Sequence, residues 1–155
     1  SKICIIFIVC YFIIKTLCGL CAGKHIHRLA AGYGEIRKTG GQVLVVLQSR
    51  PQTIAGQVKP DDLPFDIICD PEGKLYETYE INPAPSMEAM VDAPTMEKIK
   101  AAQAEGFQHG EYEGNELQLP AVVVVDRDLT VTYAHYGTTA GDVPDVKELA
   151  RLLTE

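Results

Sequence analysis

Residues 15–27, KTLCGLCAGKHIH, place Cys18 and Cys21 three positions apart, between an apolar run and a helical pattern. A helix N-terminus carries unpaired N–H groups and the positive end of the helix dipole, which stabilise a thiolate. Cysteines at this spacing in the first turn of a helix also have their sulfurs within bonding reach. The segment is therefore a redox-active dithiol, the end of a secretion signal, or a pair of buried thiols, and the flanking sequence helps to choose among these.

The apolar run before the cysteines, residues 3–14 (ICIIFIVCYFII), is predicted to be a central strand. It is shorter than the ~20 residues that a membrane span needs. It is also rich in β-branched and aromatic residues, which is typical of a strand buried on both faces. The alternative is a signal peptide, because Lys2 precedes the run and small residues follow it. In that case the protein would be secreted or periplasmic.

The residues after the cysteines predict a βαβ unit. Apolar side chains recur at helical spacing over residues 26–36, and the pattern ends at a Gly-Gly pair. Residues 42–48 (QVLVVLQ) form a continuous apolar run, which predicts a second buried strand. Three more elements are expected next: a short helix starting at Ser49 with Pro51 just inside it, a strand at residues 65–70, and a helical turn at residues 75–79.

The second half of the chain begins with an irregular segment. Residues 82–118 are polar and rich in Pro, Gly and Glu, so we expect an excursion from the core with one helix at about residues 95–104. A β-hairpin and a final helix are expected to close the fold. Their bounds are residues 121–126 and 130–136 for the two strands, and residues 146–153 for the helix, with Pro144 in its first turn.

The composition fits one globular domain over residues 1–155. The chain is 46% hydrophobic and 23% charged, and its length allows a core without disulfides. The formal net charge is -7 and the basic residues are scattered, so the basic patch that nucleic-acid binding requires is missing. We expect neither a nucleic-acid nor a membrane partner. Five cysteines without regular spacing do not resemble a disulfide framework, which favours a reducing compartment, the cytoplasm.

A Cys-x-x-Cys between the first strand and the first helix is typical of thioredoxin-like redox motifs. Cys18, at the cap, would be the more exposed and more acidic thiol, and Cys21 the resolving thiol. A zinc site with His25 and His27 is an alternative, although these histidines are closer together than zinc ligands usually are. The dithiol needs no metal and no other cofactor, and we expect none. The other cysteines lie in apolar strand segments, as small buried hydrophobes without an assigned role: Cys4, Cys10 and Cys69.

A family resemblance is carried by three segments: residues 40–49 (GGQVLVVLQS), 63–81 (LPFDIICDPEGKLYETYEI) and 119–137 (LPAVVVVDRDLTVTYAHYG). In the middle one, a strand ends in Asp-Pro-x-Gly and is followed by a short helix with Tyr79 near its end. The chain resembles the peroxiredoxin branch of the thioredoxin-like superfamily, the alkyl hydroperoxide reductase and thiol-specific antioxidant proteins. This resemblance implies an α/β fold with a mixed central sheet and helices on both faces.

The resemblance also implies binding residues and partners. Leu119 and Pro120, at the start of the hairpin strand, match the position where the family has a cis proline that faces the dithiol and holds a substrate chain. The implied substrate is a peroxide or a protein disulfide, and the implied reductant is an external thiol. Family analogy also suggests a homodimer.

The active-site signature of peroxiredoxins, Pro-x-x-x-Thr-x-x-Cys with a later Arg, does not match. If Cys21 takes the reactive position, Cys18 replaces the Thr and Ile14 the Pro; if Cys18 takes it, Lys15 and Tyr11 stand there. The strand PAVVVVD also lacks the Arg that would polarise a peroxide. We therefore interpret the chain as a thiol–disulfide oxidoreductase with weak thiol peroxidase activity. The alternative is a non-catalytic binding or regulatory domain of the same fold.

Overall fold

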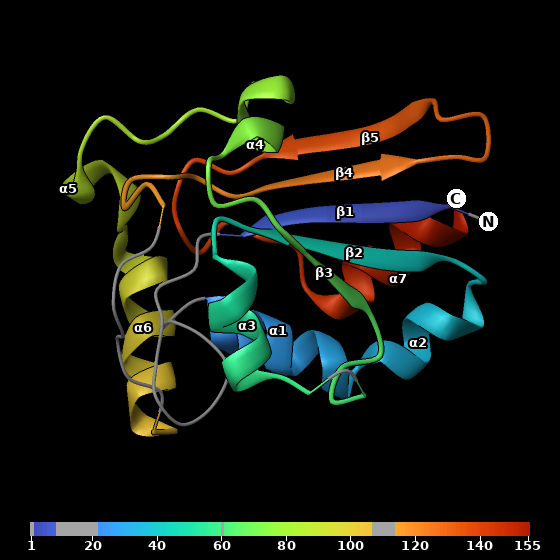
Figure 1. Cartoon of the computed structure of the whole chain (residues 1–155), viewed down its shortest axis with the longest axis horizontal. Coiled ribbons are helices and arrows are strands. Elements are labelled where there is room, and N and C mark those ends of the chain that lie inside the picture. Colours follow the sequence, from blue (N-terminus) through green and yellow to red (C-terminus); the bar gives the residue numbers. More distant parts are fainter. Residues whose placement is uncertain (1, 9–21, 60, 107–113) are drawn as a thin grey trace.

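The computed structural model describes residues 2–8, 22–59, 61–106 and 114–155. At its centre is a five-stranded sheet in the order β3-β2-β1-β4-β5 (Figure 1). Strands β1, β2 and β3 are parallel, whereas β4 runs antiparallel to β1 and β5 antiparallel to β4. The sheet is therefore mixed, as predicted. The strands span Ile3–Ile8 (β1), Gln42–Leu47 (β2), Asp66–Cys69 (β3), Ala121–Val125 (β4) and Val131–Tyr136 (β5).

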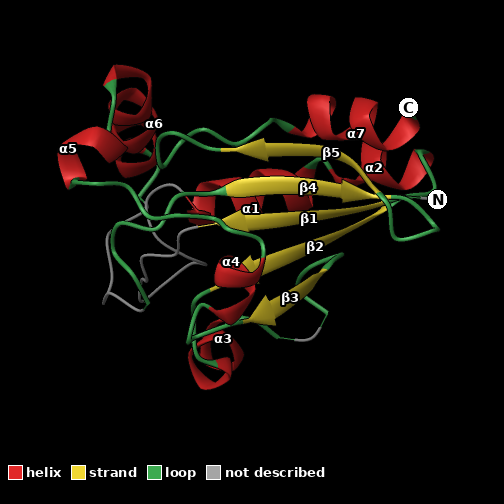
Figure 2. Ribbon diagram, turned by 90° about the horizontal axis from the view of Figure 1, so that it is seen from above, coloured by secondary structure: helices red, strands yellow, loops and turns green. Residues whose placement is uncertain are grey.

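The larger core lies between the sheet and four helices on one face (Figures 1 and 2). Side chains alternate along a strand, so Cys4 and Ile6 of β1 and Val43 and Val45 of β2 share this face. They pack against apolar residues of the first helix and the last one, which lie side by side on this face. The helices are α1 (Ala22–Ala31), α2 (Tyr33–Lys38), α3 (Pro51–Gln57) and α7 (Val146–Thr154).

The opposite face of the sheet carries a smaller aromatic core under α4 (Lys74–Thr78). The rings of Phe7 and Tyr76 meet edge to face with their centroids 5.1 Å apart. The Tyr76 hydroxyl donates a hydrogen bond to the Val46 carbonyl, at 2.9 Å. Helices thus cover both faces of the sheet, which confirms the predicted architecture.

The predicted central strand over residues 3–14 is confirmed for β1, which pairs with β2 on one side and β4 on the other. Residues 9–14 lie outside the described residues. The other four strands begin and end within one residue of their predicted bounds. In the described ranges, no helix is long and apolar enough to cross a membrane.

Several helix predictions are wrong. The helix expected to start at Ser49 begins at Pro51, and its N-cap is Arg50. The helical pattern over residues 26–36 forms two helices that are separated at Gly32. A Cβ atom at Gly32 would lie 2.9 Å from Val146 Cγ1 of α7, so the chain breaks where a bare backbone meets another helix. Pro144 is not in the first turn of α7, because Asp145 caps that helix and Pro144 precedes the cap.

The excursion contains two helices where the sequence predicted one: α5 (Met87–Met90) and α6 (Ala93–Ala104). The Ser86 hydroxyl caps α5, and the Asp92 carboxylate accepts a hydrogen bond from the Thr95 backbone N–H at the start of α6. Met90 is buried against Ala140, which follows β5. The excursion therefore rests on the segment between β5 and α7.

Candidate functional site

The carboxyl ends of β1, β2 and β3 meet at one edge of the sheet because these strands are parallel. Strand β1 ends at Ile8 and α1 begins at Ala22, so the chain that carries Cys18 and Cys21 connects this edge to α1. Both cysteines, predicted as the redox pair, lie outside the described residues. The ends of β1 and β2 and the beginning of β4 lie together at this edge.

Leu119 and Pro120 lie at this same edge. Ala121, the first residue of β4, pairs with Phe7 near the end of β1, and Pro120 directly precedes it. Pro120 is buried and its carbonyl accepts a hydrogen bond from the Gly137 N–H, at 2.9 Å. The described residues include no cis peptide bond, so the cis proline that the resemblance implied is not found. The role of Leu119 and Pro120 in holding a substrate stays a prediction.

A network of buried side-chain amides, which the sequence did not reveal, joins the end of β2 to the excursion. Gln48 donates from Nε2 to Gln118 Oε1 at 2.9 Å and accepts from the Asn115 backbone N–H at 2.7 Å. Gln118 in turn donates to the Ile81 carbonyl at 2.8 Å. A Cβ atom at Gly114 would lie 2.5 Å from Gln48 Cβ, so only glycine allows this approach. The network borders a cavity of about 710 Å³ at the carboxyl edge.

Ser49 and Arg50, which follow Gln48 after the end of β2, were also missed as site residues. Ser49 is fully buried, and its hydroxyl has no hydrogen-bond partner among the described residues. Val43, Val45 and Leu47 of β2 face α1, and Ser49 lies in the bend that follows the strand. A buried hydroxyl without a partner is costly, so it marks a place where a function can explain the cost. The available signal in the sequence was a run of three polar residues, Gln48 to Arg50, directly after an apolar run.

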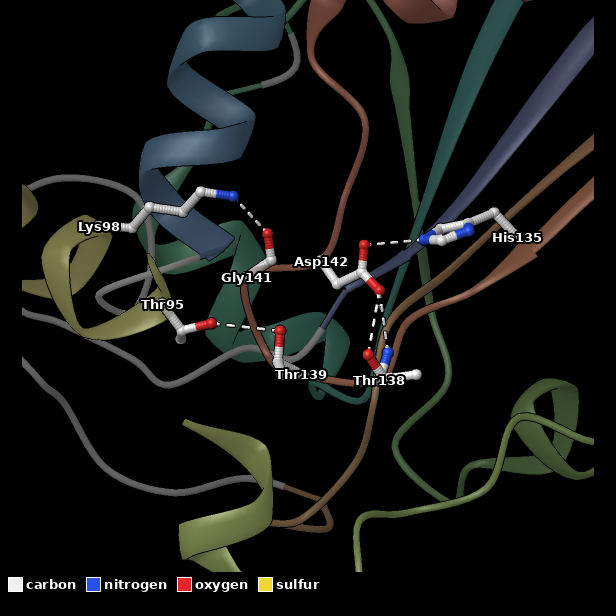
Figure 3. Close-up of polar contacts among 7 residues, drawn as sticks. All are labelled: Thr95, Lys98, His135, Thr138, Thr139, Gly141 and Asp142. Carbon is white, nitrogen blue, oxygen red and sulfur yellow. Dashed lines mark hydrogen bonds and ion pairs between the residues drawn. The ribbon is translucent and has the colours of Figure 1, made fainter. Parts of the chain in front are cut away.

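A polar cluster at the end of β5 fastens the next loop to the sheet (Figure 3). His135 Nε2 lies 2.8 Å from one oxygen of Asp142, and the Thr138 N–H donates to the other at 3.0 Å. Burial alone would raise the pKa of Asp142, but the hydrogen bonds from Thr138 and His135 hold it below its ordinary value. Thr95 of α6 bonds to Thr139 in the same loop, at 3.2 Å. The cluster thus connects β5, the loop and the excursion.

The described parts of the chain contain no group of three or more His, Cys, Asp or Glu side chains that could hold a metal ion. In the alternative zinc set of Cys18, Cys21, His25 and His27, only the His27 side chain is described, and it is exposed. Cys18, Cys21 and the His25 side chain lie outside the described parts, and the zinc site stays a prediction.

The other cysteines differ in their surroundings. Cys4 is fully buried in the core, and burial raises the pKa of its thiol to about 12. It is thus the unreactive, small hydrophobe that was predicted. Cys69 is half-buried at the last position of β3, and Cys10 lies outside the described residues.

Comparison with known proteins finds a matching family model and solved structures of similar fold. The family model described as AhpC/TSA antioxidant enzyme matches residues 28–139. A cysteine-to-serine mutant of peroxiredoxin 6 from Arenicola marina superposes with a TM-score of 0.60 at 13% identity, covering 99% of this chain and 60% of that one. A yeast mitochondrial 1-Cys peroxiredoxin gives 0.57 at 15% identity, covering 99% and 62%. The chain therefore spans about three fifths of the length of these two structures. No curated protein sequence matches it.

Proposed function

Because the chain belongs to the AhpC/TSA antioxidant enzyme family, we propose that it is a thiol-dependent oxidoreductase that uses Cys18 and Cys21 as its dithiol. The connection between β1 and α1 carries the proposal. It starts at the carboxyl edge of a central strand and enters the N-terminus of a ten-residue helix directly after Cys21. Such a helix start favours a thiolate.

The proposed cycle stores two electrons in the sulfur pair. The Cys18 thiolate attacks one sulfur of a substrate disulfide, forming a mixed disulfide and releasing the other sulfur as a thiolate. The Cys21 thiolate then attacks Cys18 Sγ, which releases the reduced substrate and leaves an internal disulfide. Two electrons from an external thiol reductant restore the dithiol, so no bound cofactor is needed. The cytoplasm would supply such a reductant.

A weak peroxidase reaction follows from the same groups. The Cys18 thiolate would attack one oxygen of a peroxide, giving a sulfenic acid and an alcohol or water once the leaving oxygen takes a proton. Condensation of the sulfenic acid with the Cys21 thiol would release water and form the same internal disulfide. Arg127 lies in the β4–β5 turn, at the edge opposite Pro120, so it supports neither step.

Ser49 and Arg50 would support the thiolate from the carboxyl end of β2. They supply a hydroxyl and a guanidinium, the two kinds of group that the signature lacks at its usual positions. The Ser49 side chain is fully buried, and its hydroxyl has no partner among the described residues. A donor and a cation near a thiolate both lower its pKa.

The non-catalytic alternative is favoured by a different observation. Met87 of α5 and Met96 of α6 are 43% and 41% exposed, on an excursion that the sheet does not cover. Exposed methionines adapt to varied apolar partners. In that case, the chain would bind a partner through the excursion, and the dithiol would be idle.

Titration with the aromatic disulfide 5,5′-dithiobis(2-nitrobenzoate) tests the proposed function. The wild-type dithiol should release two thionitrobenzoate ions in a fast phase and keep none, because Cys21 displaces the mixed disulfide. Cys21→Ser should release one ion and keep the other as a mixed disulfide on Cys18, whereas Cys18→Ser should lose most of the fast phase. Cys69→Ser is the matched control and should behave as the wild type. Equal behaviour of all three variants would favour the non-catalytic alternative.

A further inference from the structure

A second cavity, of about 600 Å³, lies between α1, α6 and the beginning of α7. Its apolar lining includes Ile6 of β1, Leu29 of α1 and Leu149 of α7, each of which is almost fully buried. Cavities of 300–1,000 Å³ with mostly apolar walls are typical of small-molecule sites. The cavity thus has the size and the floor of a site for an apolar group.

Positive charge gathers around this cavity, although the chain as a whole carries a net charge of -7. Its lining contains three cations, Arg28, Lys98 and Lys147, and one carboxylate, Asp145, which leaves an excess of two positive charges. The Asp145 carboxylate caps α7 by accepting from the Glu148 N–H at 2.9 Å. Its negative charge therefore interacts with the N-terminus of α7.

The three cations come from different elements and are exposed. Lys98 extends from α6 and donates one hydrogen bond to the Gly141 carbonyl (Figure 3), which leaves its other N–H groups available. In the described part of the chain, Arg28 and Lys147 form no ion pair. The first turn of α7, to which Val146 and Lys147 belong, adds the positive end of a helix dipole.

We propose that this cavity binds an amphipathic carboxylate, whose carboxylate group lies among Arg28, Lys98 and Lys147 and whose apolar body lies against Ile6, Leu29 and Leu149. The charged side chains are at the exposed rim and the apolar ones at the buried floor, so the two ends of the ligand have distinct places. The proposal goes beyond the dithiol chemistry and does not depend on it. The competing explanation is that the aliphatic stems of the cations only cover the apolar floor.

Calorimetric titration of the whole chain with decanoate tests the proposal. We expect saturable binding with one site, and about tenfold weaker binding of octanoate, because each buried CH₂ contributes about 0.8 kcal/mol. Decanol, which has no charge, should bind at least tenfold more weakly than decanoate. Decanoate that does not bind saturably, or that binds no better than octanoate, would overturn the proposal.

Charge variants locate the site. Arg28→Gln and Lys147→Gln should each weaken decanoate binding about tenfold, the effect of losing one hydrogen bond to a charged group. Lys100→Gln is the control, because it also removes one positive charge but Lys100 of α6 does not line the cavity. Its affinity for decanoate should equal that of the wild type. Arg28, Lys147 and Lys100 are all exposed, so the three variants should fold, and circular dichroism checks this. Equal affinities in all three variants would place binding elsewhere and refute the assignment.

Discussion

Ser49 is a residue whose hydroxyl would serve the proposed function but does not stabilise the fold. Its buried hydroxyl has no partner in the described residues, so it adds a desolvation cost without a compensating bond. It follows β2, the strand that pairs with β1, from which the chain continues to Cys18. If the hydroxyl supports the thiolate, its removal should harm the chemistry and spare the fold.

Ser49→Ala should therefore leave the melting temperature unchanged or raise it, while it slows alkylation of Cys18. Loss of a donor raises the pKa of a thiolate, and one pKa unit (~1.4 kcal/mol) lowers the reactive fraction at neutral pH about tenfold. Arg50→Gln should act in the same direction through the lost positive charge. The measurement is the rate of iodoacetamide alkylation of Cys18 between pH 5 and pH 9, read by mass spectrometry.

Arg127→Gln is the control for this series because the residue lies at the opposite edge of the sheet. It should leave the pH profile of Cys18 unchanged. A profile that is identical in all variants would remove Ser49 and Arg50 from the proposed site.

Asp142 links stability to pH. Its pKa in the folded chain is lowered, so its contribution is fully present above the unfolded pKa of ~3.9 and is lost as the pH falls through the folded value. Asp142→Asn should cost about 1 kcal/mol of unfolding free energy at pH 7, the size of one hydrogen bond. The difference from the wild type should shrink at pH 3. Urea unfolding at both pH values measures it, with the exposed Asp128→Asn as control. An equal difference at both values would contradict this assignment.

At the scale of elements, the break between α1 and α2 depends on contact with α7. Gly32→Ala would place a methyl group 2.9 Å from Val146 Cγ1, which should cost about 1–3 kcal/mol. Val146→Ala in the same chain should restore part of this loss, in a double-mutant cycle measured by urea unfolding. Gly34→Ala is the control, because a Cβ there meets no atom within 4 Å, and it should stabilise α2 slightly. Additive effects of the two substitutions would contradict the contact.

The excursion should be held to the sheet by the amide network. Gln118→Met keeps the shape of the side chain but leaves the Gln48 amide and the Ile81 carbonyl without this partner. We expect the free energy of unfolding to fall by about 1–3 kcal/mol. Hydrogen exchange in α5 and α6 should become faster than in the wild type, and more so than in the strands. Gln52→Met, on the exposed side of α3, should change neither. Unchanged exchange in α5 and α6 would mean that other contacts hold the excursion.

For the whole molecule, the sequence predicted the features that depend on short apolar runs. Residues 42–47 and 121–125 are apolar along almost their whole length because both faces of their strands are buried, so they could be recognised without any partner. The antiparallel pairing of β4 with β5 also followed from local sequence, since a short turn joins them.

The features that the sequence did not reveal depend on distant partners or on very short segments. The Gly32 break is explained by Val146 of α7, and the Gln48 amide meets Gln118, which is 70 positions away. No local pattern predicts such pairs. Helix α5 has only four residues, too few for a periodic pattern, and its main sign is the cap at Ser86. The candidate dithiol was predicted from the spacing of Cys18 and Cys21 and from their place between the first strand and the first helix.

The most direct test of the central claim is a redox titration of the whole protein against graded glutathione or dithiothreitol buffers. Thiol alkylation and mass spectrometry would report the Cys18–Cys21 disulfide at each potential. A working dithiol should give a reversible two-electron transition at about -270 to -200 mV, the range of thioredoxins and glutaredoxins. If the two thiols never pair, or react with alkylating agents only after unfolding, the oxidoreductase function is contradicted.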